Sequence, residues 1–214
     1  MISQSLTIDD FGKELLLKGD SHQVMMEWEK PYMEAIIDEI RPSGDALEIG
    51  FGCGYSATRI QKYSPKSHTI IECDPDVAAR AKIWAKNYKD ITIIENRWQN
   101  SLHTVGLYDF IFFDDYPTEI LERSHENFLR NLAQDGRFYM FIDICLDMHM
   151  NSNATLSAYV NSSSSLLDDQ RWSQVIVDNP RWEYTEKLID VDVPKNCNYF
   201  SGDKALIPIL RKKS

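Results

Sequence analysis

The chain has 214 residues, of which 43% are hydrophobic, so it is long enough to bury a sizeable core within one domain. It carries 33 acidic and 23 basic residues and a formal net charge of −10, which argues against a nucleic-acid backbone as partner, because phosphate binding needs clustered Lys and Arg. No apolar run approaches membrane-spanning length, the first residues do not resemble a signal peptide, and the four cysteines form no metal-binding pair. We therefore expect a cytoplasmic protein with no metal and no nucleic-acid or membrane partner. The oligomeric state is not predicted, and a homodimer is left open.

The N-terminal segment is expected to form a helical lid over the rest of the chain. Residues 1–20 are mixed in character, whereas the apolar residues of 22–40 approximate a period of 3.6 and predict a helix. Pro31 lies inside this stretch and is expected to mark a helix start or a kink.

From residue 45 onward, strand patterns and helix patterns alternate. Asp74 and Pro75 are typical of the N-cap and first position of a helix. The alternation predicts an α/β fold with a parallel, doubly wound sheet. Strands are expected at 45–49, 68–72, 91–95, 108–113 and 137–145, and helices from the glycines to about 63, at about 75–88 and at about 119–133.

The most informative motif is the run from Leu47 to Tyr55, in which glycines follow an apolar strand at positions 50, 52 and 54. Glycines let the backbone turn tightly and approach a ligand closely. Glu72 follows Gly52 by twenty residues, an offset typical of an acid that binds the hydroxyls of a ribose. Because Tyr55 replaces the third glycine of the dinucleotide fingerprint and no P-loop lysine follows, S-adenosylmethionine is the expected cofactor. The alternative is a tight strand-to-helix turn without a ligand.

The C-terminal part of the chain changes in pattern. Residues 150–165 are rich in Ser and Asn and are expected to form a loop or lid, followed by a helix near 165–177. Two β-rich segments, 182–192 and 197–210, suggest the antiparallel ending of a class I methyltransferase sheet. The expected fold is therefore Rossmann-like, with a mostly parallel seven-stranded sheet and an antiparallel C-terminal strand. We expect one domain, 1–214, divided into an N-terminal lid (1–40), a cofactor-binding core (44–145) and a loop, helix and C-terminal strands (146–214).

Ligands of such sheets bind outside the carboxyl ends of the parallel strands. The segments expected to line that crevice are 48–54, Glu72, 114–117 and 142–144. Asp114 and Asp115 end a buried strand, where acids are costly unless they are paired, which points to one of the two as a functional group beside the cofactor. The alternative for Asp114 and Asp115 is a helix cap or an Asx-turn before Pro117.

Four separated stretches resemble guanidinoacetate N-methyltransferases. The segment from Val24 to Met33 is similar to that family's V-M-x-x-W-E-x-P-Y-M motif, and Leu47–Gly52 is similar to its L-E-V-G-F-G turn. Ile70–Cys73 resembles its I-I-E-C strand end, and Asp114–Pro117 resembles its D-T-Y-P motif. The residues from Cys197 to Leu210 also look like its C-terminal strand, so the resemblance runs from about residue 20 to 212.

The resemblance implies a role for each matching residue. Glu29 and Asp114 match the two carboxylates that hold the guanidino group, Glu72 matches the acid on the ribose, and 96–99 matches the segment beside the adenine. Taken alone, Glu29 is more readily interpreted as a solvated helix residue, and periodicity alone indicates that Trp28 and Tyr32 are ordinary core residues. The candidate catalytic residues are Asp114 and Glu29. The candidate substrate-binding residues are Trp28, Tyr32, Asp115, Tyr116, Asp143 and Asp147. The candidate cofactor-binding residues are Glu48, Gly50, Phe51, Gly52, Gly54, Glu72, Cys73, Arg97, Trp98, Gln99 and Asp114.

The expected function is S-adenosylmethionine-dependent N-methylation of the guanidino group of a small molecule in specialised metabolism. Where the family carries Asn-Leu-Thr after its fifth strand, we align Ile142–Cys145, so an acid replaces a carboxylate-binding segment. This suggests a substrate whose tail carries an amine bound by Asp143 or Asp147, with arginine, agmatine, a cyclic guanidine or guanidinoacetate itself as candidates. The alternatives are a methyltransferase of another amine or carboxylate, and a non-catalytic cofactor-binding partner subunit.

Overall fold

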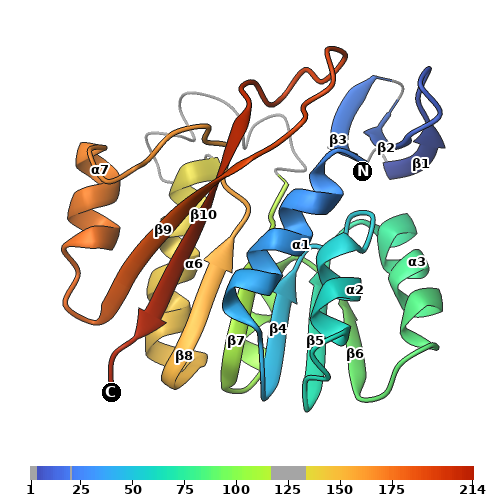
Figure 1. The fold of residues 1–214 in the computed structure, drawn as a ribbon. Coiled ribbons are helices and arrows are strands. Elements are labelled where there is room, and N and C mark those ends of the chain that lie inside the picture. Colours follow the sequence, from blue (N-terminus) through green and yellow to red (C-terminus); the bar gives the residue numbers. More distant parts are fainter. Residues whose placement is uncertain (1–3, 20, 117–133) are drawn as a thin grey trace.

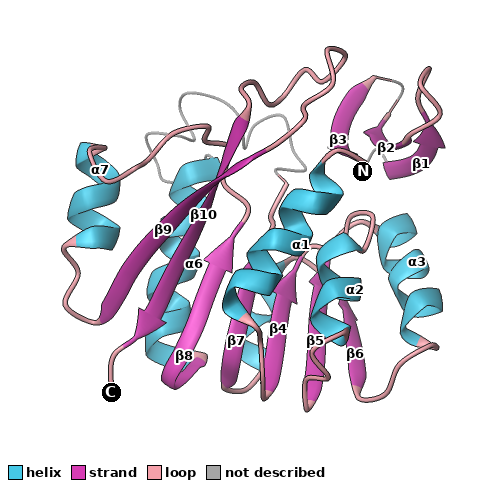
Figure 2. Cartoon of the chain, viewed as in Figure 1, coloured by secondary structure: helices cyan, strands magenta, loops and turns pink. Residues whose placement is uncertain are grey.

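The computed structural model describes residues 4–19, 21–116 and 134–214 (Figures 1 and 2). Pro117 and the helix expected at about 119–133 lie outside the described residues. The strands are β1 Gln4–Ile8, β2 Glu14–Lys18, β3 His22–Met26, β4 Asp45–Ile49, β5 Ser67–Glu72, β6 Ile91–Glu95, β7 Tyr108–Phe113, β8 Met150–Ala158, β9 Trp182–Asp190 and β10 Lys204–Lys212. The helices are α1 Glu29–Ile40, α2 Tyr55–Gln61, α3 Pro75–Ala85, α4 Trp98–Ser101, α6 Gln134–Met148 and α7 Gln170–Trp172. Short 3₁₀ and π turns follow α4 and α7, at Leu102–Thr104 and Ser173–Val177.

The main sheet in the described part of the chain has seven strands in the order β6-β5-β4-β7-β8-β10-β9. β4 pairs in parallel with both β5 and β7, and β8 continues the parallel part beside β7. β10 pairs antiparallel with β8 and β9. The expected α/β sheet with an antiparallel ending is confirmed. Because the chain leaves β4 in one direction and returns as β7 on its other side, the carboxyl ends of β4 and β7 form the switch point where such sheets bind ligands.

Alternation along the strands divides the core into two layers. In β7, Phe110 and Phe112 face the layer that contains α1, α2 and α3, whereas Ile111 and Phe113 face the layer that contains α6. Helices therefore cover both faces of the sheet, as Figure 1 shows. With both faces buried, the central parallel strands read as nearly continuous apolar runs, and this is why 45–49 and 108–113 were predicted at the correct positions. The edge strand 91–95 is only partly buried, and its predicted position is also correct.

The predicted N-terminal helical lid is wrong over residues 22–26. The first described residues form a three-stranded antiparallel sheet, β1-β2-β3, and helix α1 begins only at Glu29, two residues before Pro31. The stretch from His22 to Met26 pairs with β2 and buries Met25 and Met26. A short apolar run is compatible with either period, and here pairing with a neighbouring strand decides in favour of the strand.

The predictions for residues 137–145 and 150–158 are also wrong, in opposite senses. The first segment lies in α6, where Phe138, Phe141, Ile142 and Cys145 are buried at helical spacing. The second, expected as a loop, is β8 and lies between β7 and β10. Its Ser and Asn residues have low strand propensity, but pairing on both sides supplies the stabilisation that the side chains lack.

Several other predicted elements are confirmed with small shifts. α3 has Asp74 as its N-cap, whose side chain accepts hydrogen bonds from the backbone N–H groups of Asp76 and Val77. β9 and β10 form the expected antiparallel pair. The helix expected near 165–177 is reduced to α7 and the single turn after it. Throughout the described ranges, every helix is too short or too polar to cross a bilayer.

Candidate active site

A pocket opens at the carboxyl ends of β4, β5, β7 and β8, at the switch point of the sheet. Its non-atom space is about 940 Å³, including a part open to solvent, which lies within the range of about 300–1,000 Å³ for small-molecule sites. The glycine loop after β4, the ends of β5 and β7 and the segment 96–99 line the pocket. Val24 and Met25 of β3 line it from the N-terminal sheet.

Gly50 brings the glycine loop against the end of β7. Its φ is +83°, and a Cβ at this position would lie 2.1 Å from the carbonyl oxygen of Asp114. The loop is also tied to the sheet, because Gly50 N–H donates to the Ile71 carbonyl and Asp114 N–H donates to the Ile49 carbonyl, each at 2.9 Å. Only glycine combines this φ with this approach. The result is a bare backbone surface facing the pocket.

Glu72, at the end of β5, holds the same loop from the other side. One carboxylate oxygen accepts the Phe51 N–H and the other accepts the Asp74 N–H, each at 2.8 Å. The side chain is buried, and this burial raises the pKa of Glu72. Each carboxylate oxygen can accept more than one hydrogen bond, so Glu72 can also accept from hydroxyl groups in the pocket.

The segment 96–99 forms one wall of the pocket. The ring of Trp98 is buried against Phe113 and Phe141, and its indole N–H donates to Asp115 at 2.9 Å. Asp115 also forms an ion pair with Arg137 of α6. These contacts fix the wall and give the Asp115 carboxylate two cationic or N–H partners.

Glu29 opens helix α1 and is buried at the pocket. Its Oε1 accepts the Met26 N–H at 3.0 Å and the hydroxyl of Tyr199. Burial raises the pKa of Glu29 to about 7, although both hydrogen bonds act in the opposite direction. The carboxyl group therefore has a fixed orientation, and burial disfavours its ionised form.

Asp114 lies in the same pocket as Glu29. Burial raises its pKa well above the ordinary value, and the negative charge of Glu29 raises it further, followed by those of Glu48, Asp115 and Glu72. Two buried carboxylates whose pKa values are both raised, one of them partly by the charge of the other, form a site that favours a cation. The sequence placed these acids far apart, and the structure brings both to one pocket beside the glycine loop.

The raised pKa of Glu29 predicts that the ligand-free chain loses stability as the pH rises. Between about pH 4.5 and 7 the folded chain keeps a proton on Glu29 that the unfolded chain releases, so this group's contribution falls through that window. We expect the Glu29→Gln substitution to reduce the loss of unfolding free energy between pH 5.5 and 8 by about 2 kcal/mol. Urea titrations at the two pH values measure this difference. Glu95→Gln, at an exposed position, is the matched control, and equal pH dependence in both variants would contradict the expectation.

Eleven of the predicted site residues line the pocket, but others do not. Glu48 is fully buried on the opposite side of β4, where it pairs with His68 at 3.0 Å and accepts from Ser56. The predicted lining position of Glu48 is therefore wrong. The residues that line the pocket are Glu29, Gly50, Gly52, Glu72, Cys73, Arg97, Trp98, Gln99, Asp114, Asp115 and Tyr116.

Four further predicted residues support the pocket from behind. Phe51 packs on Trp84, and Gly54 with a φ of +75° caps helix α2. Trp28 packs on Phe200, and Tyr32 is fully buried with its hydroxyl donating to the Leu206 carbonyl. The interpretation of Trp28 and Tyr32 as core residues agrees with these contacts.

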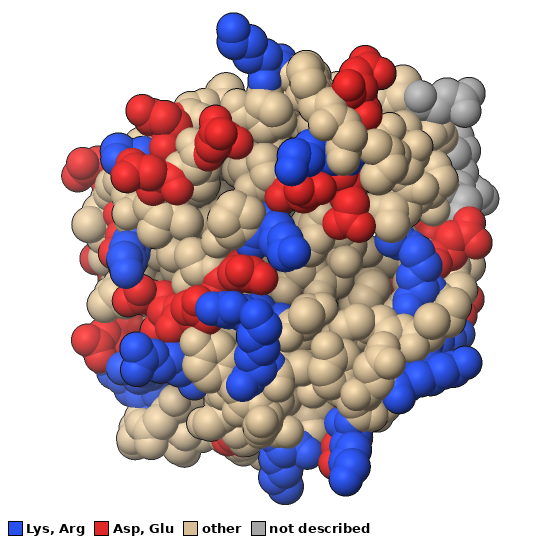
Figure 3. All heavy atoms as spheres, turned by 45° about the vertical axis from the view of Figure 1, so that its right-hand side comes forward, with Lys and Arg blue, Asp and Glu red and all other residues tan. Residues whose placement is uncertain are grey.

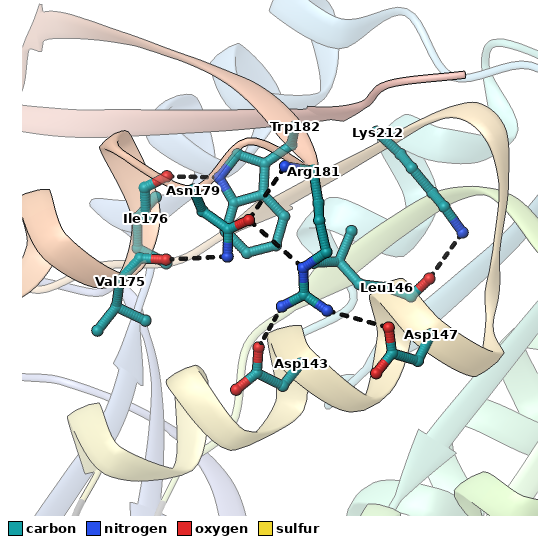
Figure 4. Close-up of polar contacts among 9 residues, drawn as sticks. All are labelled: Asp143, Leu146, Asp147, Val175, Ile176, Asn179, Arg181, Trp182 and Lys212. Atoms are coloured by element: carbon teal, nitrogen blue, oxygen red, sulfur yellow. Dashed lines mark hydrogen bonds and ion pairs between the residues drawn. The ribbon is translucent and has the colours of Figure 1, made fainter.

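The predicted placement of Asp143 and Asp147 in the crevice is wrong. Both lie on the exposed side of α6, where Asp143 Oδ1 accepts from Arg181 at 2.8 Å and Asp147 Oδ1 at 3.0 Å (Figure 4). The error follows from the strand predicted at 137–145. These residues lie inside helix α6, so the residues after 142 are not at the carboxyl end of a strand. The segment that does follow the fifth parallel strand is Tyr159–Asn161.

Sequence reasoning missed several residues of the pocket. Tyr159 and Asn161 line it after β8, Tyr199 lines it beside Glu29, and Arg137 lines it from α6. Tyr199 lies in the stretch that resembles the family's C-terminal strand, which was the one available signal. Tyr159 and Asn161 depend on the position of β8, and Arg137 on that of helix α6, neither of which the sequence pattern revealed.

The residues present fit S-adenosylmethionine. Added Cβ atoms at Gly50 and Gly52 would reach 2.1 Å from the Asp114 carbonyl and 2.8 Å from Met25 Sδ, so the bare backbone keeps the cradle open. Glu72 offers a buried acceptor at the end of β5, and the two acids Glu29 and Asp114 suit a sulfonium and a cationic substrate. The described residues contain no cluster of three metal-ligating side chains. On the face shown in Figure 3, Lys and Arg are interspersed with Asp and Glu rather than gathered in one basic strip.

Comparison with known proteins agrees with this geometry. The chain is 34% identical over 122 residues to protein arginine N-methyltransferase 2 of Saccharomyces cerevisiae, and 32% identical over 142 residues to that of Aspergillus oryzae. These matches cover 54% and 61% of this chain but only 30% and 34% of the relatives, so the chain spans about a third of their length. Among solved structures, N-methyltransferase NodS from Bradyrhizobium japonicum in complex with S-adenosyl-L-homocysteine has the same fold, with a TM-score of 0.59 at 16% identity over 87% of this chain and 88% of NodS. The guanidinoacetate N-methyltransferase family matches residues 7–213. The chain therefore belongs to the guanidinoacetate N-methyltransferase family of S-adenosylmethionine-dependent enzymes and has the class I methyltransferase fold.

Proposed function

We propose that this chain transfers a methyl group from S-adenosylmethionine to a nitrogen of a guanidino compound. One observation carries the proposal: Glu29 and Asp114 converge in a single pocket beside the glycine loop. A guanidinium is planar and cationic, and its fork of N–H donors matches carboxylate oxygens. An amine offers fewer donors and no plane, so two facing acids suit it less well.

The electrostatics of the pocket support a cationic substrate. In the absence of a cation, burial raises the pKa values of Glu29 and Asp114, and repulsion by the charge of Glu29 raises the pKa of Asp114 further. A bound guanidinium neutralises this repulsion and restores the charge of both groups. The site is therefore complementary to a cation that also donates hydrogen bonds.

Asp114 is the proposed proton acceptor. A guanidinium nitrogen has no free lone pair, so it must lose a proton to Asp114 as the new nitrogen–carbon bond forms and the sulfur–carbon bond breaks. Glu29 holds another edge of the guanidino group, in an orientation set by Met26 N–H and the Tyr199 hydroxyl. Bound S-adenosylmethionine supplies the electrophilic methyl group. Holding the nitrogen in line with it accounts for much of the rate, since positioning alone is worth up to about 7–11 kcal/mol.

The proposed cofactor contacts occupy the other half of the pocket. Glu72 binds the ribose hydroxyls, the glycine loop passes along the cofactor, and 96–99 flank the adenine. These roles rest on the positions of the residues at the ends of β4, β5 and β6.

An amine-bearing substrate tail is no longer favoured over the other candidates. The argument for it depended on Asp143 and Asp147, which do not line the pocket. We propose a small guanidino compound such as guanidinoacetate, arginine, agmatine or a cyclic guanidine. A second candidate is the arginine side chain of a protein, favoured by the similarity to relatives named protein arginine N-methyltransferase 2. We keep the cytoplasmic location as a prediction.

A substrate panel tests the proposal. Methyl transfer is measured as S-adenosylhomocysteine formation with guanidinoacetate, arginine, agmatine, a cyclic guanidine and an arginine-containing peptide. Glycine and ornithine are the guanidine-free controls. We expect turnover with at least one guanidino compound and none with the controls, and turnover of the peptide alone selects the second candidate. Turnover of an amine or carboxylate alone, or cofactor binding without any turnover, overturns the proposed function.

A further inference from the structure

Tyr159 stands beside Asp114, one of the two acids, at the end of the sheet. It follows β8, and its backbone N–H donates to the Phe113 carbonyl at 3.0 Å, one residue before Asp114. The ends of neighbouring strands β7 and β8 therefore carry Asp114 and Tyr159 side by side. Tyr159 lines the same pocket as Glu29 and Asp114.

The hydroxyl of Tyr159 is buried and forms no hydrogen bond with any described residue. Its ring is held in place by Tyr32, at 5.7 Å between ring centroids. The neighbouring tyrosines differ, since Tyr32 donates to the Leu206 carbonyl and Tyr199 donates to Glu29. A buried polar group without a partner is rare in a folded chain and calls for an explanation such as a ligand.

The electrostatic surroundings keep this hydroxyl neutral. Burial raises the pKa of Tyr159, and the negative charges of Glu29 and Asp114 raise it further. A phenol in this position does not act as a base. It offers an oxygen with lone pairs that are able to accept N–H donors.

The order of the strands separates the two halves of the pocket. Across β5, β4, β7 and β8 the pocket residues are Glu72, Gly50, Asp114 and Tyr159 in turn. The cofactor half lies over β5 and β4, so Tyr159 lies on the far side of Asp114 from it. With the cofactor bound as proposed, this is the side left for the substrate.

We propose that the Tyr159 hydroxyl binds the substrate, as a third acceptor for the N–H groups of the guanidino group held by Glu29 and Asp114. The inference rests on the proposed function and adds to it a residue that neither the sequence motifs nor the resemblance indicated. A monosubstituted guanidinium carries five N–H donors, and Glu29 Oε1 already accepts two hydrogen bonds from the protein, so a further acceptor in the pocket helps to satisfy the group. A third contact fixes the plane of the group and with it the nitrogen that faces the methyl.

The test is Tyr159→Phe, with Tyr63→Phe as the matched control. Tyr63 donates to Asp38 Oδ1 at 2.7 Å outside the pocket. For Tyr159→Phe we expect the KM of the guanidino substrate to rise about 10- to 100-fold, while the Kd of S-adenosylmethionine changes less than about twofold. Because the deleted hydroxyl has no partner among the described residues, its loss is expected to leave the Tm unchanged or higher. The Tyr63→Phe variant is expected to keep the wild-type KM.

The outcomes separate this inference from the proposed function. If the wild type methylates a guanidino compound and Tyr159→Phe has the wild-type KM, the inference is overturned and the proposed function stands. A KM that rises together with an equal loss of cofactor affinity or of Tm points to a structural role and also overturns it. If the wild type methylates no guanidino compound, the proposed function fails and the inference fails with it.

Discussion

The Asp114→Asn substitution is expected to lower kcat for methyl transfer by about 10²- to 10⁴-fold, the usual loss when a proton acceptor is removed. Asparagine keeps the shape of the side chain and one acceptor oxygen, but it takes up no proton. The substitution also removes the repulsion between the negative charges of Glu29 and Asp114. The unfolding free energy is therefore expected to stay the same or increase. Steady-state kinetics and urea unfolding measure the two effects separately.

Loss of activity without loss of stability is the informative combination. Asp190→Asn is the matched control, because Asp190 is exposed on β9 and pairs with Lys204 at 2.6 Å. We expect this variant to retain wild-type kcat. An Asp114→Asn enzyme that keeps kcat within about threefold of wild type would remove Asp114 from the chemistry, since a lost proton acceptor costs far more.

The largest expected effect on stability comes from Gly50→Ala. Its Cβ would lie 2.1 Å from the Asp114 carbonyl oxygen, at a φ of +83° that disfavours any side chain. The loop and the end of β7 are both held by backbone hydrogen bonds, so neither is free to yield. We expect the unfolding free energy to fall by about 3 kcal/mol or more, together with loss of cofactor binding.

Gly12→Ala separates the clash from the backbone conformation. Gly12 has a similar φ of +76°, but no atom lies within 4 Å of its added Cβ. This variant is expected to lose only about 1 kcal/mol, the cost of the left-handed conformation itself. Denaturant unfolding of both variants gives the comparison, and equal losses would show that the close approach to Asp114 is unimportant.

The first half of the main sheet was predictable because local signals agree with one another there. β4, β6 and β7 are continuous apolar runs at their predicted positions, and the glycines after β4 turn the chain toward α2. Asp74 and Pro75 mark the start of α3 by capping chemistry that needs no tertiary context.

The second half of the main sheet was predicted wrongly because two segments have compositions typical of a different secondary structure. The stretch around α6 is rich in Phe, Tyr and Ile, which favour strands, yet its buried residues Phe138, Phe141, Ile142 and Cys145 repeat at helical spacing. β8 contains Asn151, Ser152 and Asn153, which are typical of loops. Its place between β7 and β10 is a tertiary property that no local pattern contains.

The same division applies to the pocket. Gly50, Glu72 and Asp114 lie at the ends of correctly predicted strands, so the sequence indicated them directly. Tyr159 was missed because its strand was missed. The misplaced Asp143 shows the converse, since one wrong element moved an exposed helix residue into a proposed binding site.

The hydrogen bond from Tyr199 to Glu29 joins positions 170 residues apart. During synthesis, a nascent chain that ends just after β8 already contains β4, β5, β6 and β7, but Glu29 still lacks the phenol that orients it. Such distant pairings form only after much of the polypeptide is ordered. If Glu29 binds a guanidine as proposed, that binding depends on the last hairpin having been synthesised and folded. The segments proposed to hold the adenosine, which end at residue 99, leave the ribosome about a hundred residues before Tyr199.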